Sequence, residues 1–191
     1  MKSHFFAYIS RLRFISRWAL MRNTAPENVQ EHSHQTAVLA HALALIRNKR
    51  FGGHVDPGAV AVAALYHDAS EILTGDMPTP IKYYSPSIRS AYQEVEAEAN
   101  RKLLEMLPPE LRESYAPVLE IPDPELRALV KAADKLSAYI KCVEEVKAGN
   151  GEFGDAARQT RATLESFGLP EVDYFLETFM DSFSLTLDQL K

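Results

Sequence analysis

Apolar residues recur every three or four positions along most of this chain, a spacing that predicts helices. The clearest run covers residues 29–50. Asn28 followed three positions later by Glu31 resembles a capping box at its start, and Gly52 and Gly53 end it. We therefore predict one long helix over residues 29–50.

A histidine interrupts the apolar side of this predicted helix. At about 100° per residue, His32 lies on the apolar stripe, whereas His34 and His41 project to the other side. The other residues of the stripe are Thr36, Leu39, Leu43 and Ile46. We expect His32 to face the core and the other two histidines to face away from it.

Five further segments carry the helical spacing. Asp56 and Pro57 are a cap and a first-turn proline, which open a helix that stops near Gly75. The other four segments cover residues 85–107, 124–149, 155–167 and 171–183. The prolines at positions 78 and 80 forbid a regular helix and predict a stiff, extended loop over residues 76–80.

The remaining patterns limit the fold class. Residues 1–21 are typical of an amphipathic helix that packs on a core. The chain contains no alternating run long enough for a sheet, no internal repeat and no break in composition. We therefore predict an all-α helical bundle that forms a single domain over residues 1–191.

Composition excludes several classes of function. The net charge of −5 and the lack of a polybasic run oppose binding to a long nucleic acid. No window reaches the length of a membrane span, and Arg11, Arg13 and Arg17 interrupt any signal-peptide apolar region. The single cysteine, Cys142, excludes an intramolecular disulfide and a two-thiolate zinc site, which fits a cytoplasmic protein. We expect Cys142 to be a small core residue.

Polar residues stand inside the apolar run of residues 57–75. His67 lies beside Asp68, and Glu71 follows one helical turn later, so the three side chains converge. Burying this set is costly unless a cation or a hydrogen-bond partner compensates. The alternative is that His67 and Asp68 only form a buried hydrogen-bonded pair with each other.

A fourth polar residue, Asp134, lies at the edge of the apolar side of residues 124–149, among small residues. With His32, His67 and Asp68 it makes four potential ligands on three predicted helices, which a bundle can project into one cavity. Two imidazoles and two carboxylates suit a divalent first-row metal better than calcium. The alternative is a structural, hydrogen-bonded group without an ion.

Five short stretches extend this pattern over nearly the whole chain. They are Arg17-Trp18, Glu31-His32-Ser33, residues 66–71, residues 74–80 and residues 131–136. The order of His32, His67-Asp68 and Asp134 resembles that of the HD-domain metal-dependent phosphohydrolases. Together, the five stretches resemble the bacterial 5'-deoxynucleotidases of the YfbR type.

This resemblance implies an all-helical, cytoplasmic homodimer that removes the 5'-phosphate from deoxyribonucleoside monophosphates, with one cobalt or manganese ion. It implies that the metal ligands are His32, His67, Asp68 and Asp134. It further implies a catalytic role for Glu71, nucleotide contacts by Arg17 and Trp18, and sugar selection by Asp76.

Elementary chemistry is compatible with those roles. A divalent ion is neutralised by two aspartates, so a phosphate dianion needs a further cation, which Arg17 supplies. Trp18 offers a flat face on which a base can stack, Asp76 can accept a hydrogen bond from the sugar, and Lys82 can assist with the phosphate. The expected mechanism is metal-assisted attack of water on the phosphate. Glu71 would orient or deprotonate that water, or pass a proton to the leaving 5'-oxygen.

Other functions of the same pattern stay open. A stringent-response hydrolase is disfavoured because Ile72, and not an aspartate, follows Glu71. Hydrolysis of another nucleotide, such as a nucleoside triphosphate or another phosphoester, and a non-catalytic nucleotide-binding module remain as alternatives.

Overall fold

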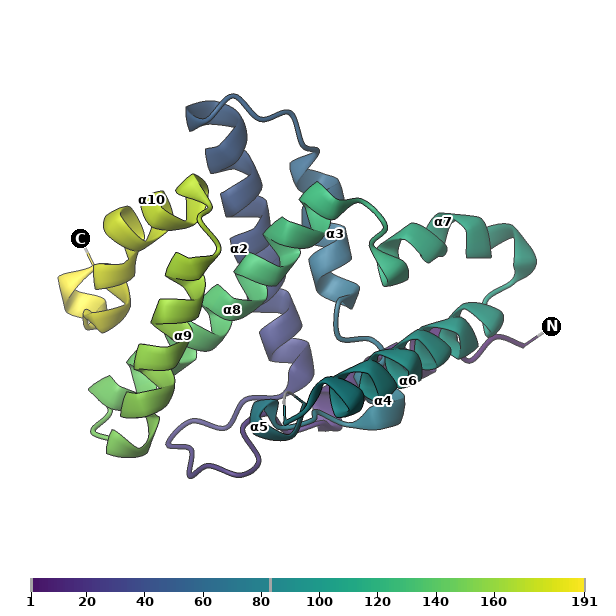
Figure 1. The fold of residues 1–191 in the computed structure, drawn as a ribbon, viewed down its shortest axis with the longest axis horizontal. Coiled ribbons are helices and arrows are strands. Elements are labelled where there is room, and N and C mark those ends of the chain that lie inside the picture. Colours follow the sequence, from purple (N-terminus) through teal and green to yellow (C-terminus); the bar gives the residue numbers. More distant parts are fainter. Residues whose placement is uncertain (1, 83, 191) are drawn as a thin grey trace.

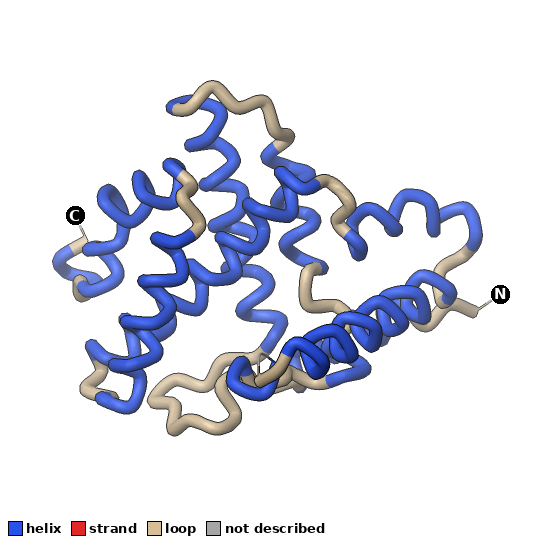
Figure 2. The backbone as a smooth tube through the Cα atoms, viewed as in Figure 1, coloured by secondary structure: helices blue, strands red, loops and turns tan. Residues whose placement is uncertain are grey.

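The computed structural model describes residues 2–82 and 84–190, and the regular elements in these two ranges are helices (Figures 1 and 2). A single isolated bridge joins Ser16 and Asn28 in the described chain. The all-α fold predicted from the sequence is therefore confirmed.

Ten α-helices and four short 3₁₀ helices follow one another through the described residues. The α-helices are α1 (Phe5–Ile9), α2 (Val29–Arg50), α3 (Pro57–Tyr66), α4 (Glu71–Thr74), α5 (Thr79–Lys82), α6 (Pro86–Glu105), α7 (Pro109–Glu120), α8 (Pro124–Lys147), α9 (Gly154–Ser166) and α10 (Pro170–Phe179). The 3₁₀ helices are η1 (Ser10–Phe14), η2 (Gly151–Phe153), η3 (Met180–Ser184) and η4 (Leu187–Gln189).

Side-chain caps start the three helices that build the centre of the molecule. Asn28 accepts from the backbone of Glu31, whose side chain accepts from the backbone of Asn28, so the predicted capping box of α2 is present. Asp56 caps α3 and Asp123 caps α8, each followed by a proline in the first turn. Local sequence therefore defines where each of these helices begins.

Helices α2, α3 and α8 pack against one another at the centre. Helices α9 and α10 and the C-terminus lie on one side of them, and α6, α7 and the N-terminus lie on the other (Figure 1). The larger hydrophobic cluster fills the centre, with Leu43, Val60 and Leu136 fully buried. A smaller cluster around Phe5 and Leu103 joins the N-terminal segment to α6 and α7.

Two predictions about individual positions are confirmed. His32 is fully buried, whereas His34 and His41 are exposed on the same helix. Cys142 is a buried free thiol, and burial raises its pKa to about 11. Such a thiol is a poor nucleophile at neutral pH.

The helix predicted from Pro57 to Gly75 was wrong in its middle. Helix α3 ends at Tyr66, residues 67–70 form a turn, and α4 begins at Glu71. Backbone bonds that span three residues hold this turn: Ala69 N–H donates to Tyr66 and Glu71 N–H donates to Asp68. His67 and Asp68 therefore project from a turn, and the prediction of three ligand-bearing helices is corrected to two helices and a turn.

Three other segments differ from prediction. Helix α7 was missed, because Pro108 and Pro109 indicated only the end of α6, whereas Pro109 also fits the first turn of a new helix. The loop predicted over residues 76–80 gives way to α5 at Thr79. The N-terminal amphipathic helix is limited to α1 and η1.

Among the described residues, no helix combines the length and the apolar character that a bilayer span requires.

We expect Leu43→Ala to lower the free energy of unfolding by about 2–5 kcal/mol, because it leaves a cavity in the fully buried centre. Leu45→Ala is the matched control: the substitution is the same, two positions away on α2, at a site that is 39% exposed. Its expected loss is below about 1 kcal/mol. Urea unfolding followed by circular dichroism measures both values, and equal losses would contradict this placement of the core.

Candidate active site

His32 and Asp134 meet between α2 and α8. The Nε2 atom of His32 lies 3.0 Å from Oδ1 of Asp134 and 3.6 Å from Oδ2 of Asp68. His32 has no exposed surface, whereas the Asp134 side chain remains 30% exposed. The cluster is therefore closed on the α2 side and open on the side of the carboxylates.

The turn between α3 and α4 adds His67 and Asp68 to this pair. The Nε2 atom of His67 lies 3.1 Å from Oδ2 of Asp68 and 3.9 Å from Oδ1 of Asp134. Ligand atoms of His32, His67 and Asp68 all lie within 4.8 Å of one another. The structure thus brings together all four residues that the sequence indicated as possible metal ligands.

Hydrogen bonds orient both imidazoles toward the carboxylates. The Nδ1 atom of His67 lies 2.8 Å from the carbonyl oxygen of Ala64, so Nδ1 carries the proton. The Nδ1 atom of His32 lies 3.1 Å from the hydroxyl of Ser137, which itself donates to Gln35 at 3.2 Å. Each Nε2 atom therefore faces acidic oxygens, and the hydroxyl of Thr36 also lies 3.4 Å from Nε2 of His32.

This donor set fits a divalent cation. The Nε2 atom of His67 is buried and makes no hydrogen bond, although two carboxylates lie close to it. Two nitrogen lone pairs that face two anionic groups repel one another unless a positive charge lies between them. Ring nitrogens held by a carbonyl and a hydroxyl on their far side are typical of histidines that bind metals.

The close packing of imidazoles and carboxylates shifts the pKa values of the cluster residues. Burial opposes protonation of His67, but the carboxylates of Asp68 and Asp134 outweigh it and raise its pKa well above the ordinary value. Burial alone would raise the pKa of Asp68, yet His67 and His32 lower it to about 2. The cluster therefore attracts positive charge strongly, as a cation site does.

Glu71 begins α4 beside the cluster and is only 7% exposed. Its Oε2 atom is buried without a hydrogen-bond partner. Burial, together with the charges of Asp68 and Asp76, raises its pKa from 4.5 to about 9. A buried carboxyl group with a strongly raised pKa is typical of a residue that transfers protons.

Arg17 supplies the positive charge at the edge of this site. Its Nη1 atom lies 3.6 Å from Oδ2 of Asp68, and its Nε donates to Oε2 of Glu27 at 3.1 Å. Burial would lower its pKa, but the surrounding carboxylates raise it. Asp76 follows α4 nearby, and burial raises its pKa although Arg17 opposes that change. Arg17 therefore remains charged among several acidic groups.

Trp18 lies next to Arg17 in a left-handed backbone conformation, with a φ of 56°. Its indole N–H donates to Oε2 of Glu27 at 3.1 Å, and its ring lies 5.3 Å from the ring of Phe153. A residue with a Cβ rarely adopts this conformation, and such outliers concentrate at functional sites.

Lys82 contacts α6. Its ammonium group lies 2.8 Å from Oε1 of Glu96 and 4.7 Å from the ring centre of Tyr92. These contacts tie α5 to α6 and do not join Lys82 to the histidine and aspartate cluster.

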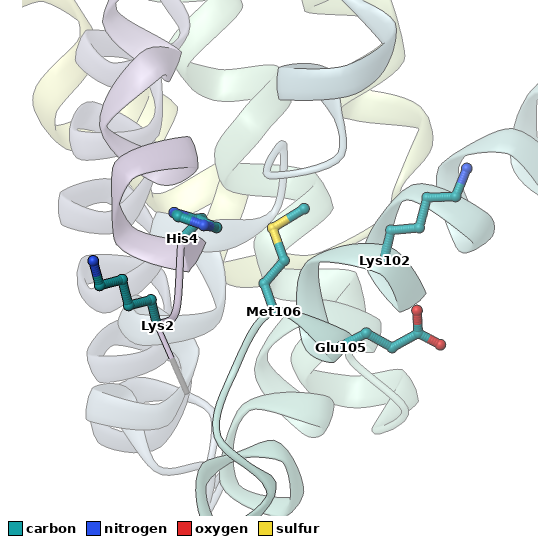
Figure 3. A pocket seen from close by; sticks show the side chains of 5 residues that line it. All are labelled: Lys2, His4, Lys102, Glu105 and Met106. Atoms are coloured by element: carbon teal, nitrogen blue, oxygen red, sulfur yellow. The ribbon is translucent and has the colours of Figure 1, made fainter.

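Three residues of the site were missed by sequence reasoning: Glu27, Gln35 and Ser137. Each acts by holding another side chain, and a glutamate, a glutamine or a serine carries no distinctive spacing. A charge-bearing hollow of about 390 Å³ elsewhere on the surface, at the C-terminal end of α6, contains none of the cluster residues (Figure 3). It is lined by Lys2, His4, Lys102, Glu105 and Met106.

Known proteins resemble this chain along nearly all of its length. The model of the YfbR-like 5'-deoxynucleotidase family matches residues 4–183. A 5'-deoxynucleotidase of Photobacterium profundum is 51% identical over 191 residues, which cover 99% of this chain and 98% of that protein. The 5'-deoxynucleotidase YfbR of Escherichia coli is also 51% identical, over 99% of this chain and 96% of its own.

Solved structures share the fold at lower identity. An HD-domain phosphohydrolase of Listeria innocua has a TM-score of 0.80 and 24% identity, over 94% of this chain and 88% of its own. The HD phosphohydrolase DatZ of cyanophage S-2L, bound to dA and one catalytic Zn²⁺ ion, has a TM-score of 0.65 and 23% identity. That match covers 92% of this chain and 96% of DatZ.

We expect Glu71→Gln to stabilise the metal-free protein at pH 8 by at least about 1 kcal/mol. The pKa of Glu71 is about 9 in the folded state and 4.5 ordinarily, so the unfolded chain loses a proton that the folded protein keeps. Stability from this group therefore falls as the pH rises from about 4.5 to 9, and the glutamine removes that loss.

Urea unfolding in the presence of a chelator at pH 8 and pH 5 measures this difference. The stabilisation should shrink at pH 5, because this pH lies close to the ordinary pKa of 4.5 and the unfolded chain there gains little free energy by losing the proton. The same gain at both values would show that the carboxyl group does not titrate as described.

Proposed function

Because the chain belongs to the YfbR-like 5'-deoxynucleotidase family, we propose that it hydrolyses deoxyribonucleoside 5'-monophosphates. The proposed site of the reaction is the cluster around His32. The reaction converts the nucleotide and water into a deoxyribonucleoside and inorganic phosphate. The bond between phosphorus and the 5'-oxygen breaks, and the leaving oxygen takes a proton.

One observation carries this assignment to the site. The unpartnered Nε2 of His67 faces two carboxylates, beside a buried carboxyl group with a raised pKa and a charged guanidinium. A cation site, a proton-transferring group and a phosphate-binding cation are the three parts that hydrolysis of a phosphate ester requires.

The proposed ligands of one divalent ion are His32, His67, Asp68 and Asp134. We propose cobalt or manganese, and the zinc ion of the related DatZ fold supports a first-row metal in this kind of cluster. When bound, the ion would polarise a phosphate oxygen and acidify the attacking water.

The neighbouring side chains are assigned to the nucleotide. Arg17 binds the phosphate, because its guanidinium stays charged beside Asp68. Trp18 stacks on the base, and Asp76 accepts a hydrogen bond from the sugar 3'-hydroxyl while leaving no room for a 2'-hydroxyl. Lys82 assists with the phosphate from α5, in competition with its ion pair to Glu96.

Glu71 exchanges a proton with the reacting groups. It gives one to the leaving 5'-oxygen, as its raised pKa favours, or takes one from the attacking water when a bound cation lowers that pKa.

The family resemblance also leads us to propose a cytoplasmic homodimer. Light scattering of the purified protein measures its mass, and a monomer at micromolar concentration would contradict the dimer.

We expect Glu71→Gln to lower kcat for deoxyadenosine 5'-monophosphate by about 100-fold or more, because an amide cannot exchange the proton. Phosphate release from that substrate, from adenosine 5'-monophosphate and from deoxyadenosine triphosphate tests the substrate class. Equal turnover of the ribonucleotide, or preference for the triphosphate, would favour a different HD-type hydrolase. Nucleotide binding without turnover would favour a binding module.

We expect His32→Ala to abolish stoichiometric binding of Co²⁺, measured by calorimetry and by elemental analysis after gel filtration. His41→Ala is the matched control, because it removes the same side chain from an exposed position of the same helix. It should keep one ion per chain. Retention of the ion by His32→Ala would contradict the proposed ligand set.

A further inference from the structure

The carboxylate of Glu27 holds two neighbouring side chains at once. Its Oε2 atom accepts a hydrogen bond from Nε of Arg17 and another from Nε1 of Trp18, each at 3.1 Å. The side chains of Arg17 and Glu27 are only 11% and 12% exposed. One oxygen of a largely buried side chain therefore sets the direction of both the guanidinium and the indole.

The backbone places Glu27 opposite these two residues. The N–H of Arg17 donates to the carbonyl of Glu27 at 3.0 Å, next to the bridge between Ser16 and Asn28. The chain leaves this pair at Trp18 and returns at Glu27, which forms a closed loop over residues 18–27. Glu27 thus lies at the base of this loop, beside Arg17 on the opposite segment and Trp18 at the start of the loop.

A second anchor ties the loop to α8. Glu145, which is 1% exposed, accepts hydrogen bonds from the backbone N–H groups of Thr24 and Ala25 and pairs with Lys141. Asn23 donates to the carbonyl of Trp18, whose φ of 56° needs such support. The loop therefore has a defined shape in which Glu27 is the contact that reaches the side chains.

The hydrogen bond from Arg17 to Glu27 also decides which nitrogens of the guanidinium can contact a ligand. Glu27 occupies Nε, while Nη1 lies 3.6 Å from Asp68 at the edge of the cluster. A guanidinium held on one side presents its other nitrogens in a fixed fork, which suits an anion with several oxygens.

We propose that Glu27 is a positioning residue that orients Arg17 toward the phosphate and Trp18 toward the base of the nucleotide. This inference rests on the proposed function, in which these two residues bind the substrate. Preorganisation of the pair lowers the cost of ordering two long side chains when the nucleotide binds.

Kinetics of Glu27→Gln and Glu27→Ala with deoxyadenosine 5'-monophosphate test the role. The KM should rise about tenfold in the alanine variant and less in the glutamine variant, which keeps one acceptor oxygen, while kcat changes less than about threefold. Glu152→Gln is the control, because Glu152 accepts from the backbone of Arg22 in the same loop without touching Arg17 or Trp18. It should match the unaltered protein.

Tryptophan fluorescence gives a readout that does not depend on turnover. Trp18 is the only tryptophan of the chain, so its emission reports the indole directly. Glu27→Gln should shift the emission maximum to longer wavelength and lower the anisotropy, with Co²⁺ binding and the melting temperature unchanged. If Glu27→Ala fails to fold, the isosteric glutamine variant decides the test.

The outcomes separate this inference from the proposed function. If the unaltered protein hydrolyses the nucleotide but Glu27→Gln leaves KM and emission unchanged, the inference is overturned and the proposed function stands. A fall in kcat with an unchanged KM overturns it as well. If the unaltered protein releases no phosphate, the proposed function fails, and unchanged emission in Glu27→Gln would separately exclude the orienting contact.

Discussion

Two imidazole nitrogens that face two carboxylates inside a helical bundle form the interaction on which the rest of this structure depends. His32 comes from α2, Asp134 from α8, and His67 with Asp68 from the turn after α3. These elements enclose the main hydrophobic cluster, so packing of the core also sets the distances between the four groups. Burying such a cluster costs free energy that a positive charge offsets, and this need links the fold to the chemistry proposed for it.

Two polar groups beside the cluster differ in their state of charge. Burial and two neighbouring carboxylates keep the pKa of Glu71 high, whereas Arg17 stays charged because acidic groups surround it. A site that combines acidic groups with a guanidinium can attract an anion as well as a cation. This balance distinguishes it from an acidic surface patch.

Helix α8 supports both halves of the proposed site. It carries Asp134 toward the histidines, and three turns later it carries Glu145, which anchors the loop that presents Arg17 and Trp18. The carboxylate proposed to bind the cation and the anchor of the loop next to the groups proposed to bind the substrate therefore belong to one helix.

The sequence by itself determined the helical class, the start of α2 at its capping box, the inward direction of His32 and the identity of the four clustered residues. These features follow from local periodicity and capping, which act within a few residues along the chain. Only the tertiary structure decided that His67 and Asp68 lie in a turn, that Pro109 begins α7, and that Glu27 joins Arg17 to Trp18. A turn with bonds spanning three residues competes closely with a continuous helix. The Glu27 contact depends on how a loop closes on itself, and neither outcome is encoded in spacing along the chain.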